Sequence, residues 1–205
     1  MEKIVEDCFF IAGSEMSSNI YILKDKKSTI IIDTGDGGVE IKEKPDFVFL
    51  THGHFDHTGG VREDWGENWD VFLRKEDFIK GFPYHTPKNA KELKVNHITI
   101  GSFDLDFIHT PGHTPGGITI FEKNRKILFT GDTLFSDGWI GRTDLLGGNE
   151  ELLFKSLKTL VVRFASDETR KGVEKDGMDI PLNVRGLFKD SISIFCPGHG
   201  LPLKL

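Results

Sequence analysis

The sequence predicts an α/β fold in which helices cover a largely buried β-sheet. Several short segments are apolar over four or five consecutive residues, which is typical of strands with both faces buried. Between residues 150 and 164, apolar residues instead recur at helical spacing. Several apolar segments also run into a Gly or Pro turn followed by His or Asp. Loops of this kind, converging at one edge of an open sheet, are how α/β folds form sites.

The predicted strands are runs of β-branched or aromatic residues, and each is bounded by residues that favour turns. They dominate the first half of the chain, and strands of the same type continue after it. In chain order, the predicted strands cover residues 4–11, 19–23, 29–32, 47–50, 71–73, 105–109, 118–121, 127–129 and 192–196.

The clearest helical pattern covers Glu150–Phe164. Asn149 is a suitable N-cap, two glutamates occupy the first turn, and four apolar residues from Leu153 to Phe164 recur on one face. Shorter helices are predicted at residues 39–43, 59–63 and 75–80.

The whole chain, residues 1–205, has the length of one domain with a substantial core. Residues 165–190 are rich in charge and glycine and have no clear periodicity, although they include several apolar side chains. A connection of that length is uncommon in a compact domain and is usually a lid or a binding loop when ordered. We therefore predict one domain, with a surface insertion or lid at residues 165–190.

Charge and cysteine content disfavour several classes of function. The chain has 26 basic and 32 acidic residues and a net charge of −6, without a block of Lys or Arg. Nucleic acids and anionic membranes are therefore disfavoured partners, because neutralising phosphates dominates those affinities. No apolar run approaches the roughly 20 residues that span a bilayer, and the N-terminal run is too short for a signal peptide. Cys8 and Cys196 do not form a disulfide framework, so we expect a cytoplasmic protein.

The chain has 23 glycines and 8 histidines, and five of the histidines lie near glycines in turns that follow predicted strands. The strand at residues 47–50 runs into THGHFDH, and the strand at 105–109 runs into TPGHTPG. The strands at 127–129 and 192–196 run into TGDT and PGHG, and the strand at 29–32 ends at DTG. Because glycine permits sharp turns and close backbone approach, we expect these loops to converge.

Imidazoles and carboxylates predominate in these loops, a combination that suits Zn, Fe or Mn. On an extended backbone His52 and His54 can reach one ion, while Asp56 and His57 can point towards a second. A catalytic tetrahedral site takes about three protein ligands and a water, so the candidates suffice for two ions that share a carboxylate. The seven candidate ligands are His52, His54, Asp56, His57, His113, Asp132 and His199.

The run T-H-x-H-x-D-H at residues 51–57, followed in order by His113, Asp132 and His199, resembles the metallo-β-lactamase superfamily. The resemblance covers nearly the whole chain. It implies an αββα sandwich of two mixed sheets flanked by helices, with the metals at one edge.

The same resemblance implies a role for each ligand. The first ion would be bound by His52, His54 and His113. The second would be bound by Asp56, His57 and His199. Asp132 would bridge the two ions, and Asp33 would orient a ligand histidine by accepting a hydrogen bond from its other ring nitrogen.

The segments GDTLF at residues 131–135 and IGRTDL at 140–145 resemble the glyoxalase II-like branch, which includes hydroxyacylglutathione hydrolases. This implies a hydrolase of a thioester or other small acyl ester that uses a hydroxide bridging two divalent ions, with zinc preferred over iron or manganese. Asp56 is the candidate catalytic residue, because it can also orient the nucleophile. Arg142 is either a substrate contact or an ion-pair partner. Glyoxalase II enzymes usually carry a C-terminal helical region that contacts glutathione, but only six residues follow His199, so glutathione recognition stays open.

Two other functions are compatible with these residues. A mononuclear iron sulfur (persulfide) dioxygenase would use only His52, His113 and Asp132, a two-His-one-carboxylate set with open positions. A non-catalytic protein would use the fold as a metal-binding scaffold. The expected partner is a small-molecule substrate, with no nucleic acid or membrane, and the oligomeric state is not predicted. The remaining histidines, His85, His97 and His109, are interpreted as packed or surface residues.

Overall fold

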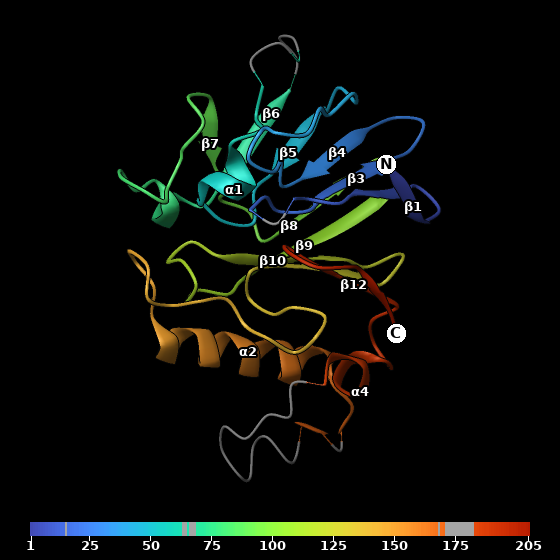
Figure 1. Cartoon of the computed structure of the whole chain (residues 1–205). Coiled ribbons are helices and arrows are strands. Elements are labelled where there is room, and N and C mark those ends of the chain that lie inside the picture. The colour runs from blue at the N-terminus through green and yellow to red at the C-terminus, as the bar shows by residue number, and fades with distance from the viewer. Residues whose placement is uncertain (15, 63–64, 66–68, 168, 171–182) are drawn as a thin grey trace.

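The computed structural model contains two β-sheets packed face to face (Figure 1). It describes residues 1–14, 16–62, 65, 69–167, 169–170 and 183–205. Within these residues, one sheet has seven strands in the order β1-β2-β3-β4-β5-β6-β7, and the other has six in the order β13-β12-β11-β10-β9-β8. Both sheets mix parallel and antiparallel pairs. This is the expected αββα sandwich of two mixed sheets.

The central strands β3 and β4 of the N-terminal sheet have side chains buried on both faces. Tyr21 and Leu23 of β3 point into the core between the sheets, whereas Ile20 and Ile22 pack on the outer face. The strands are β1 (Glu2–Val5), β2 (Cys8–Ile11), β3 (Ile20–Lys24), β4 (Thr29–Ile32), β5 (Phe47–Phe49), β6 (Asp70–Leu73) and β7 (Ala90–Glu92).

The C-terminal sheet brings three strand ends to one edge. Strands β11 and β12 are parallel, and β9 runs the same way because both β9 and β11 are antiparallel to β10. The strands are β8 (His97–Ile100), β9 (Phe103–His109), β10 (Ile118–Glu122), β11 (Ile127–Gly131), β12 (Ile194–Pro197) and β13 (Leu203–Lys204). In the N-terminal sheet β4 and β5 are also parallel, and the two edges meet where the backbone N–H of Ile118 donates to the carbonyl of Thr51 at 2.8 Å.

Two helices cover the outer face of the C-terminal sheet (Figure 1). Helix α2 (Glu150–Phe164) begins at the predicted N-cap, where the Asn149 side chain accepts from the backbone N–H of Leu152 at 2.9 Å. Helix α4 (Val184–Phe188) joins the same apolar cluster. It lies in the latter part of the predicted insertion, whereas residue 168 and residues 171–182 lie outside the described residues, so the lid stays a prediction.

The outer face of the N-terminal sheet is covered mainly by loops, and here some predicted elements are wrong. Residues 39–43 form no helix, and neither do 59–62, while position 63 lies outside the described residues. Instead Ile41 and Val61 pack onto the sheet from irregular backbone. The short helix α1 (Phe55–Thr58) lies close by, and the predicted helix at 75–80 is a single 3₁₀ turn, η2 (Lys75–Asp77).

Three strands were not predicted from the sequence, and one predicted strand forms two strands in the structure. Residues 4–11 form the hairpin of β1 and β2, because Asp7 takes a left-handed conformation with φ of 60°. Strands β7, β8 and β13 have sequences that are short or largely polar.

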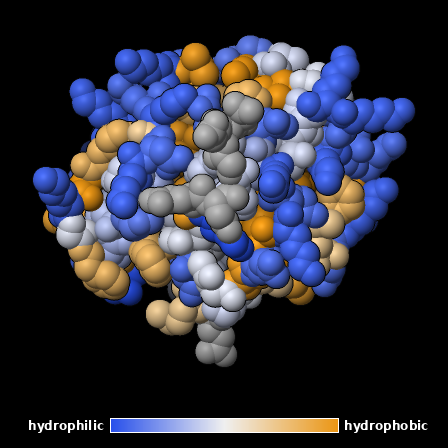
Figure 2. All heavy atoms as spheres, turned by 90° about the horizontal axis from the view of Figure 1, so that it is seen from above, coloured by the Kyte–Doolittle hydropathy of each residue, from blue (hydrophilic) through white to orange (hydrophobic). Residues whose placement is uncertain are grey.

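Viewed from above, the molecule presents mainly hydrophilic side chains with scattered apolar ones (Figure 2). Among the described residues, no helix has the length and apolar character needed to cross a bilayer.

The fold depends on the apolar core between the sheets, and a matched pair of leucines tests this. Leu105 is fully buried in that core, whereas Leu201 is 72% exposed. We expect Leu105→Ala to lower the free energy of unfolding by about 2–5 kcal/mol, because it removes buried methyl groups and leaves a cavity. Leu201→Ala should change it by less than about 0.5 kcal/mol. Chemical denaturation measures both, and equal losses would contradict the assignment of the core.

Candidate metal centre

All seven candidate ligands lie at the edge where the carboxyl ends of β5, β9, β11 and β12 meet. The loop after β5 and helix α1 carry four of them, and each of the other three strands is followed by one. They form three overlapping groups whose ligand atoms lie within 4.8 Å of one another. These groups are His52–His54–His113, His52–His57–Asp132 and Asp56–His57–His199.

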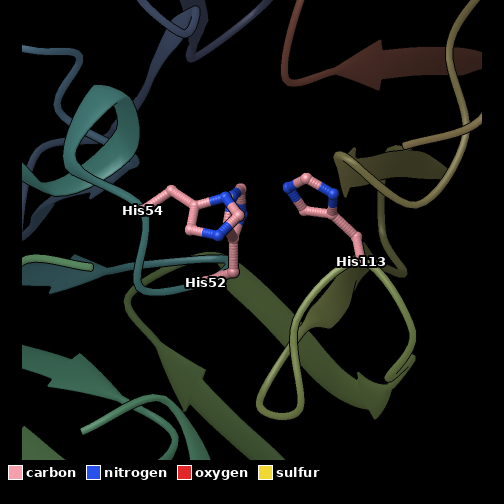
Figure 3. A group of neighbouring side chains, drawn as sticks. All are labelled: His52, His54 and His113. Atoms are coloured by element: carbon pink, nitrogen blue, oxygen red, sulfur yellow. The ribbon is translucent and has the colours of Figure 1, made fainter. Parts of the chain in front are cut away.

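The first group joins the two sheets. His52 and His54 come from the loop after β5, and His113 faces them from the loop between β9 and β10 (Figure 3). The Nε2 atom of His52 lies 3.2 Å from Nδ1 of His54. All three side chains are buried. Three imidazoles facing one another at this range can provide three ligand nitrogens to one ion.

The group Asp56–His57–His199 lies beside His52–His54–His113, and Asp132 lies between the two. His199 Nε2 lies 3.1 Å from Oδ2 of Asp56, and His57 Nε2 lies 3.7 Å from the same oxygen. Asp132 has one oxygen 3.2 Å from His57 Nε2 and the other 3.6 Å from both His113 Nε2 and His199 Nε2. This carboxylate therefore contacts both groups, as the bridging position requires.

Hydrogen bonds on the far side of two rings direct their other nitrogens inward. The Nδ1 atom of His57 lies 2.8 Å from Asp33 Oδ2, and Nδ1 of His113 lies 2.7 Å from the carbonyl oxygen of Arg142. Because both partners are acceptors, Nδ1 carries the proton and Nε2 is left to bind a metal. Both Nε2 atoms, and Oδ1 of Asp132, are buried without a hydrogen-bond partner. Divalent ions fit these orphaned atoms.

Asp33 holds its position through a left-handed backbone, with φ of 56°. Its Oδ1 accepts from the backbone N–H of Thr51 at 2.7 Å, and Oδ2 accepts from the Thr51 hydroxyl at 2.8 Å. The same Oδ2 faces His57. The predicted orienting role therefore fits the structure, in which Asp33 connects the end of β4 to the loop after β5.

Burial and neighbouring charges set the protonation of the centre. Burial lowers the pKa of His52 well below its usual value, and burial lowers the pKa of His54 to about 3, so both rings are neutral at pH 7. Burial also opposes charge on His57 and Asp132. There the mutual attraction of the two groups, with Asp33 acting on His57, outweighs burial and raises the pKa of His57 while lowering the pKa of Asp132. The Asp132 carboxylate is therefore charged and can bind a cation, and a cation at Nε2 of His57 would displace the proton from that nitrogen.

Asp77 was not singled out from the sequence, yet it connects two ligand-bearing loops. Its Oδ2 accepts from the Gly53 N–H and the Thr114 hydroxyl, both at 2.8 Å, and Oδ1 accepts from the Gly116 N–H at 2.6 Å. The side chain is fully buried. It therefore fixes the loop of His52 and His54 against the loop of His113. An isolated Asp in a short polar segment offers no local signal of this role.

Asn19 and Tyr21 hold the loop that carries His199. The Asn19 side-chain amide donates to the carbonyls of Pro197 at 3.1 Å and Gly200 at 2.7 Å, and the Tyr21 hydroxyl donates to Pro197 at 2.6 Å. These contacts reach from β3 of one sheet to the end of β12 in the other. Only the tertiary structure makes them visible, because the sequence separation exceeds 170 residues.

Gly198 is needed for close approach within this loop. A Cβ added there would collide with Oδ1 of Asp132 and would lie 2.8 Å from Cε1 of His57. The glycine before His199 therefore makes room for the carboxylate that lies between the two groups.

A cleft of about 730 Å³ opens above the ligands. Its floor includes His54, Asp56, His113, Asp132 and His199. Apolar side chains come from both halves of the chain: Met16, Phe55, Phe82 and Pro83 from the N-terminal half, and Phe135, Ile140 and Leu145 from the C-terminal half. Arg142 also lines the cleft, with its guanidinium paired to Asp144 at 2.7 and 2.6 Å. The ion-pair role is thus present, and substrate contact stays a proposal.

The other histidines lie outside the three ligand groups. His85 Nδ1 lies 2.9 Å from the Thr58 hydroxyl, His97 joins an exposed ion-pair cluster with Asp104 and Asp106, and His109 faces the carbonyl of Pro115. These positions fit packed and surface roles.

Residues 13–168 match the metallo-beta-lactamase superfamily. The chain belongs to this superfamily. Its members bind divalent metals and act as hydrolases or oxidoreductases, and the His and Asp groups of this chain lie where such a metal centre is expected.

Individual superfamily relatives agree with this assignment. The probable metallo-hydrolase YqgX of Bacillus subtilis is 37% identical over 165 residues, which are 69% of this chain and 77% of the relative. The hydroxyacylglutathione hydrolase GloC of Haemophilus influenzae is 31% identical over 71% of this chain and 79% of its own. The crystal structure of BLEG-1, a B3 metallo-beta-lactamase, has a TM-score of 0.67 and 28% identity, covering 96% of this chain and 93% of that one.

Replacing Asp33 tests the orientation of His57 in this superfamily site. We expect Asp33→Asn to weaken zinc binding at the Asp56–His57–His199 group by about 10–100-fold, because the charged acceptor behind the His57 ring is lost. Calorimetric titration of chelator-stripped protein with zinc measures the affinity. Asp70→Asn, at an exposed ion pair with Lys91, is the matched control. Unchanged zinc affinity in Asp33→Asn would contradict the orienting role.

Asp77 has a pH signature of its own. Burial raises its folded-state pKa above 3.8 despite three hydrogen bonds, so the folded protein loses stability as pH rises from about 3.8 through the folded pKa. Asp77→Asn cannot ionise, and it leaves at least one loop donor without an acceptor, which costs about 1–3 kcal/mol. We therefore expect Asp77→Asn to lower the free energy of unfolding more at pH 4 than at pH 7, because the stability that the unmodified protein gains from Asp77 is greater at pH 4. Chemical denaturation of chelator-treated protein at pH 4 and at pH 7 measures the free energy of unfolding. A loss that is larger at pH 7 than at pH 4 would refute the assignment.

Proposed function

We propose that this protein is a metal-dependent hydrolase of a thioester or other small acyl ester, with two divalent ions, zinc preferred, at the seven-ligand centre. The observation that carries the proposal is the sharing of Asp132 between two ligand groups on the floor of a cleft. A small-molecule substrate can enter this cleft and place its carbonyl above both groups.

Two divalent ions bound there would lower the pKa of a water between them and polarise an acyl carbonyl. The residues of the chain supply position and charge. Asp33 and the Arg142 carbonyl fix the rings of His57 and His113, while Asp77 and Asn19 fix the loops that carry the ligands.

Asp56 is the proposed catalytic residue. It borders the cleft, and its Oδ2 atom lies 3.1 Å from Nε2 of His199. Burial opposes its charge, but the hydrogen bond from His199 and the field of His57 outweigh burial and lower its pKa. The charged carboxylate can accept a hydrogen bond from the attacking water and orient it towards the carbonyl.

Water is the nucleophile that this site favours. Cys8 and Cys196 are buried in the core between the sheets, and burial raises the pKa of the Cys8 thiol to about 12 and also raises the pKa of Cys196. Both therefore stay protonated, and neither is among the residues that line the cleft, so these thiols do not act on substrate.

The alternatives use parts of the same centre. A mononuclear iron sulfur dioxygenase needs only His52, His113 and Asp132. The additional grouping of Asp56, His57 and His199 within 4.8 Å favours the hydrolase, because the dioxygenase would have no use for a second ligand set. A metal-binding protein without activity would have no need of an open cleft above the ligands.

Metal content and turnover of one preparation test the proposal. We expect protein purified without added metal to contain two divalent ions per chain and to hydrolyse acyl thioesters, monitored by thiol release. Asp132→Asn should lower kcat/KM by at least about 100-fold, the scale of losing one preorganised charge at a reacting centre. Asp70→Asn on the surface should leave kcat/KM unchanged.

Other outcomes identify the alternatives. One iron per chain with oxygen uptake on a persulfide substrate would replace the hydrolase by the dioxygenase. Two bound metals without turnover of thioesters, oxygen esters or persulfides would favour the non-catalytic protein, and failure to bind any metal on titration would refute all three.

A further inference from the structure

The cleft above the candidate centre is predominantly apolar. Three of its aromatic or aliphatic side chains are among the most exposed large hydrophobic residues described: Phe82 is 89% exposed, Met16 is 79% exposed and Phe55 is 46% exposed. Trp139 and Leu146, at 73% and 53%, directly adjoin the lining residues Ile140 and Leu145. Holding such surface in water costs free energy, and a concentration of it around one opening marks a binding site for an apolar group.

Apart from the divalent ions proposed at its floor, the cleft offers few cationic groups to an anionic substrate. Among the described residues that line it, Arg142 is the one Lys or Arg, and both oxygens of Asp144 already neutralise its guanidinium. Asp36 adds a carboxylate to the same lining. Glutathione carries two carboxylates, which cationic side chains bind most strongly when these are free of other partners. The described walls offer none.

The apolar walls lie on both sides of the ligand floor. Phe55 directly precedes Asp56 at the start of α1, and its backbone N–H donates to the carbonyl of Pro83, which joins this residue to the loop of Phe82. On the other side, the Phe135 ring lies 6.2 Å from the His199 ring. An acyl chain leaving the floor therefore meets aromatic surface in either direction.

We propose that the preferred substrates are esters or thioesters with an extended apolar acyl chain on an uncharged carrier, rather than glutathione thioesters. This inference rests on the proposed hydrolase function and specifies its substrate class. The apolar walls bind the acyl chain and expel water from it, while the carbonyl lies over the floor between Asp56 and Asp132. In the reaction, water adds to the carbonyl and the carbon–sulfur bond breaks, which yields a carboxylate and a thiol.

A graded substrate series tests this preference. The probes are acetyl, butyryl, hexanoyl and octanoyl thioesters of N-acetylcysteamine, compared with S-lactoylglutathione, on protein with its metals bound. We expect kcat/KM to rise with each added methylene by up to about fourfold, the fold-change that corresponds to burial of one CH₂. The octanoyl thioester should exceed S-lactoylglutathione by more than tenfold.

Variants of the walls connect the preference to named residues. Phe82→Ser and Leu145→Ser should flatten the dependence on chain length without changing metal content or melting temperature. Val95→Ser, at a 47% exposed position outside the cleft lining, is the matched control and should keep the full dependence. Equal flattening in the control, or a chain-length series that is flat in the unmodified protein, would overturn the inference.

A binding measurement separates this inference from the proposed function. The octyl thioether of N-acetylcysteamine cannot be hydrolysed, and we expect it to bind metal-free protein at least tenfold more tightly than the methyl thioether. If the octyl thioether binds in this way but no thioester is hydrolysed, the hydrolase proposal fails and the apolar specificity stands. If thioesters are hydrolysed with S-lactoylglutathione preferred, the hydrolase stands and the apolar specificity fails.

Discussion

Four buried atoms of the candidate ligand residues lack hydrogen-bond partners, and they define the central constraint on this structure. They are the Nε2 atoms of His54, His57 and His113, and Oδ1 of Asp132. Leaving such atoms unpaired costs about 1–3 kcal/mol each, and more when they are charged. The protein therefore has to keep imidazoles and carboxylates together against their tendency to separate or hydrate. Much of the surrounding polar structure holds these groups in place. Divalent ions at the centre would satisfy the unpaired atoms at once.

The two sheets share this task. The core between them fixes their relative position, and the polar contacts at the edge then cross from one sheet to the other. Asn19 and Tyr21 of the N-terminal sheet hold the backbone around His199, and Thr51 accepts from the first residue of β10. A ligand group that draws on both sheets can form only when the whole sandwich has folded, so metal binding and global stability are coupled.

The sequence predicted the ligand residues of the centre better than it predicted the residues that hold them in place. Residues 52–57 bring four candidate ligands into one short run, and the later ligands each follow an apolar strand, so their types and order are local information. Asp77 could not be predicted, because its role arises from contacts with Gly53 and Gly116 that only folding creates. The loop covering of the N-terminal sheet was missed for a similar reason. Ile41 and Val61 are buried singly, and single apolar residues carry no periodicity.

The floor and the walls of the cleft have different structural origins. The floor comes from strand ends that the core holds in register, whereas the walls come from loops such as those of Phe82 and Leu145. Wall residues can therefore change without moving the ligands, and relatives can share a metal centre while differing in substrate. Two connections limit this freedom: the Arg142 carbonyl orients His113, and the Tyr84 hydroxyl donates to the carbonyl of Leu146 across the two walls. Side chains such as those of Phe82 and Leu145 can vary, but the Tyr84 side chain and the backbone that carries these two carbonyls cannot.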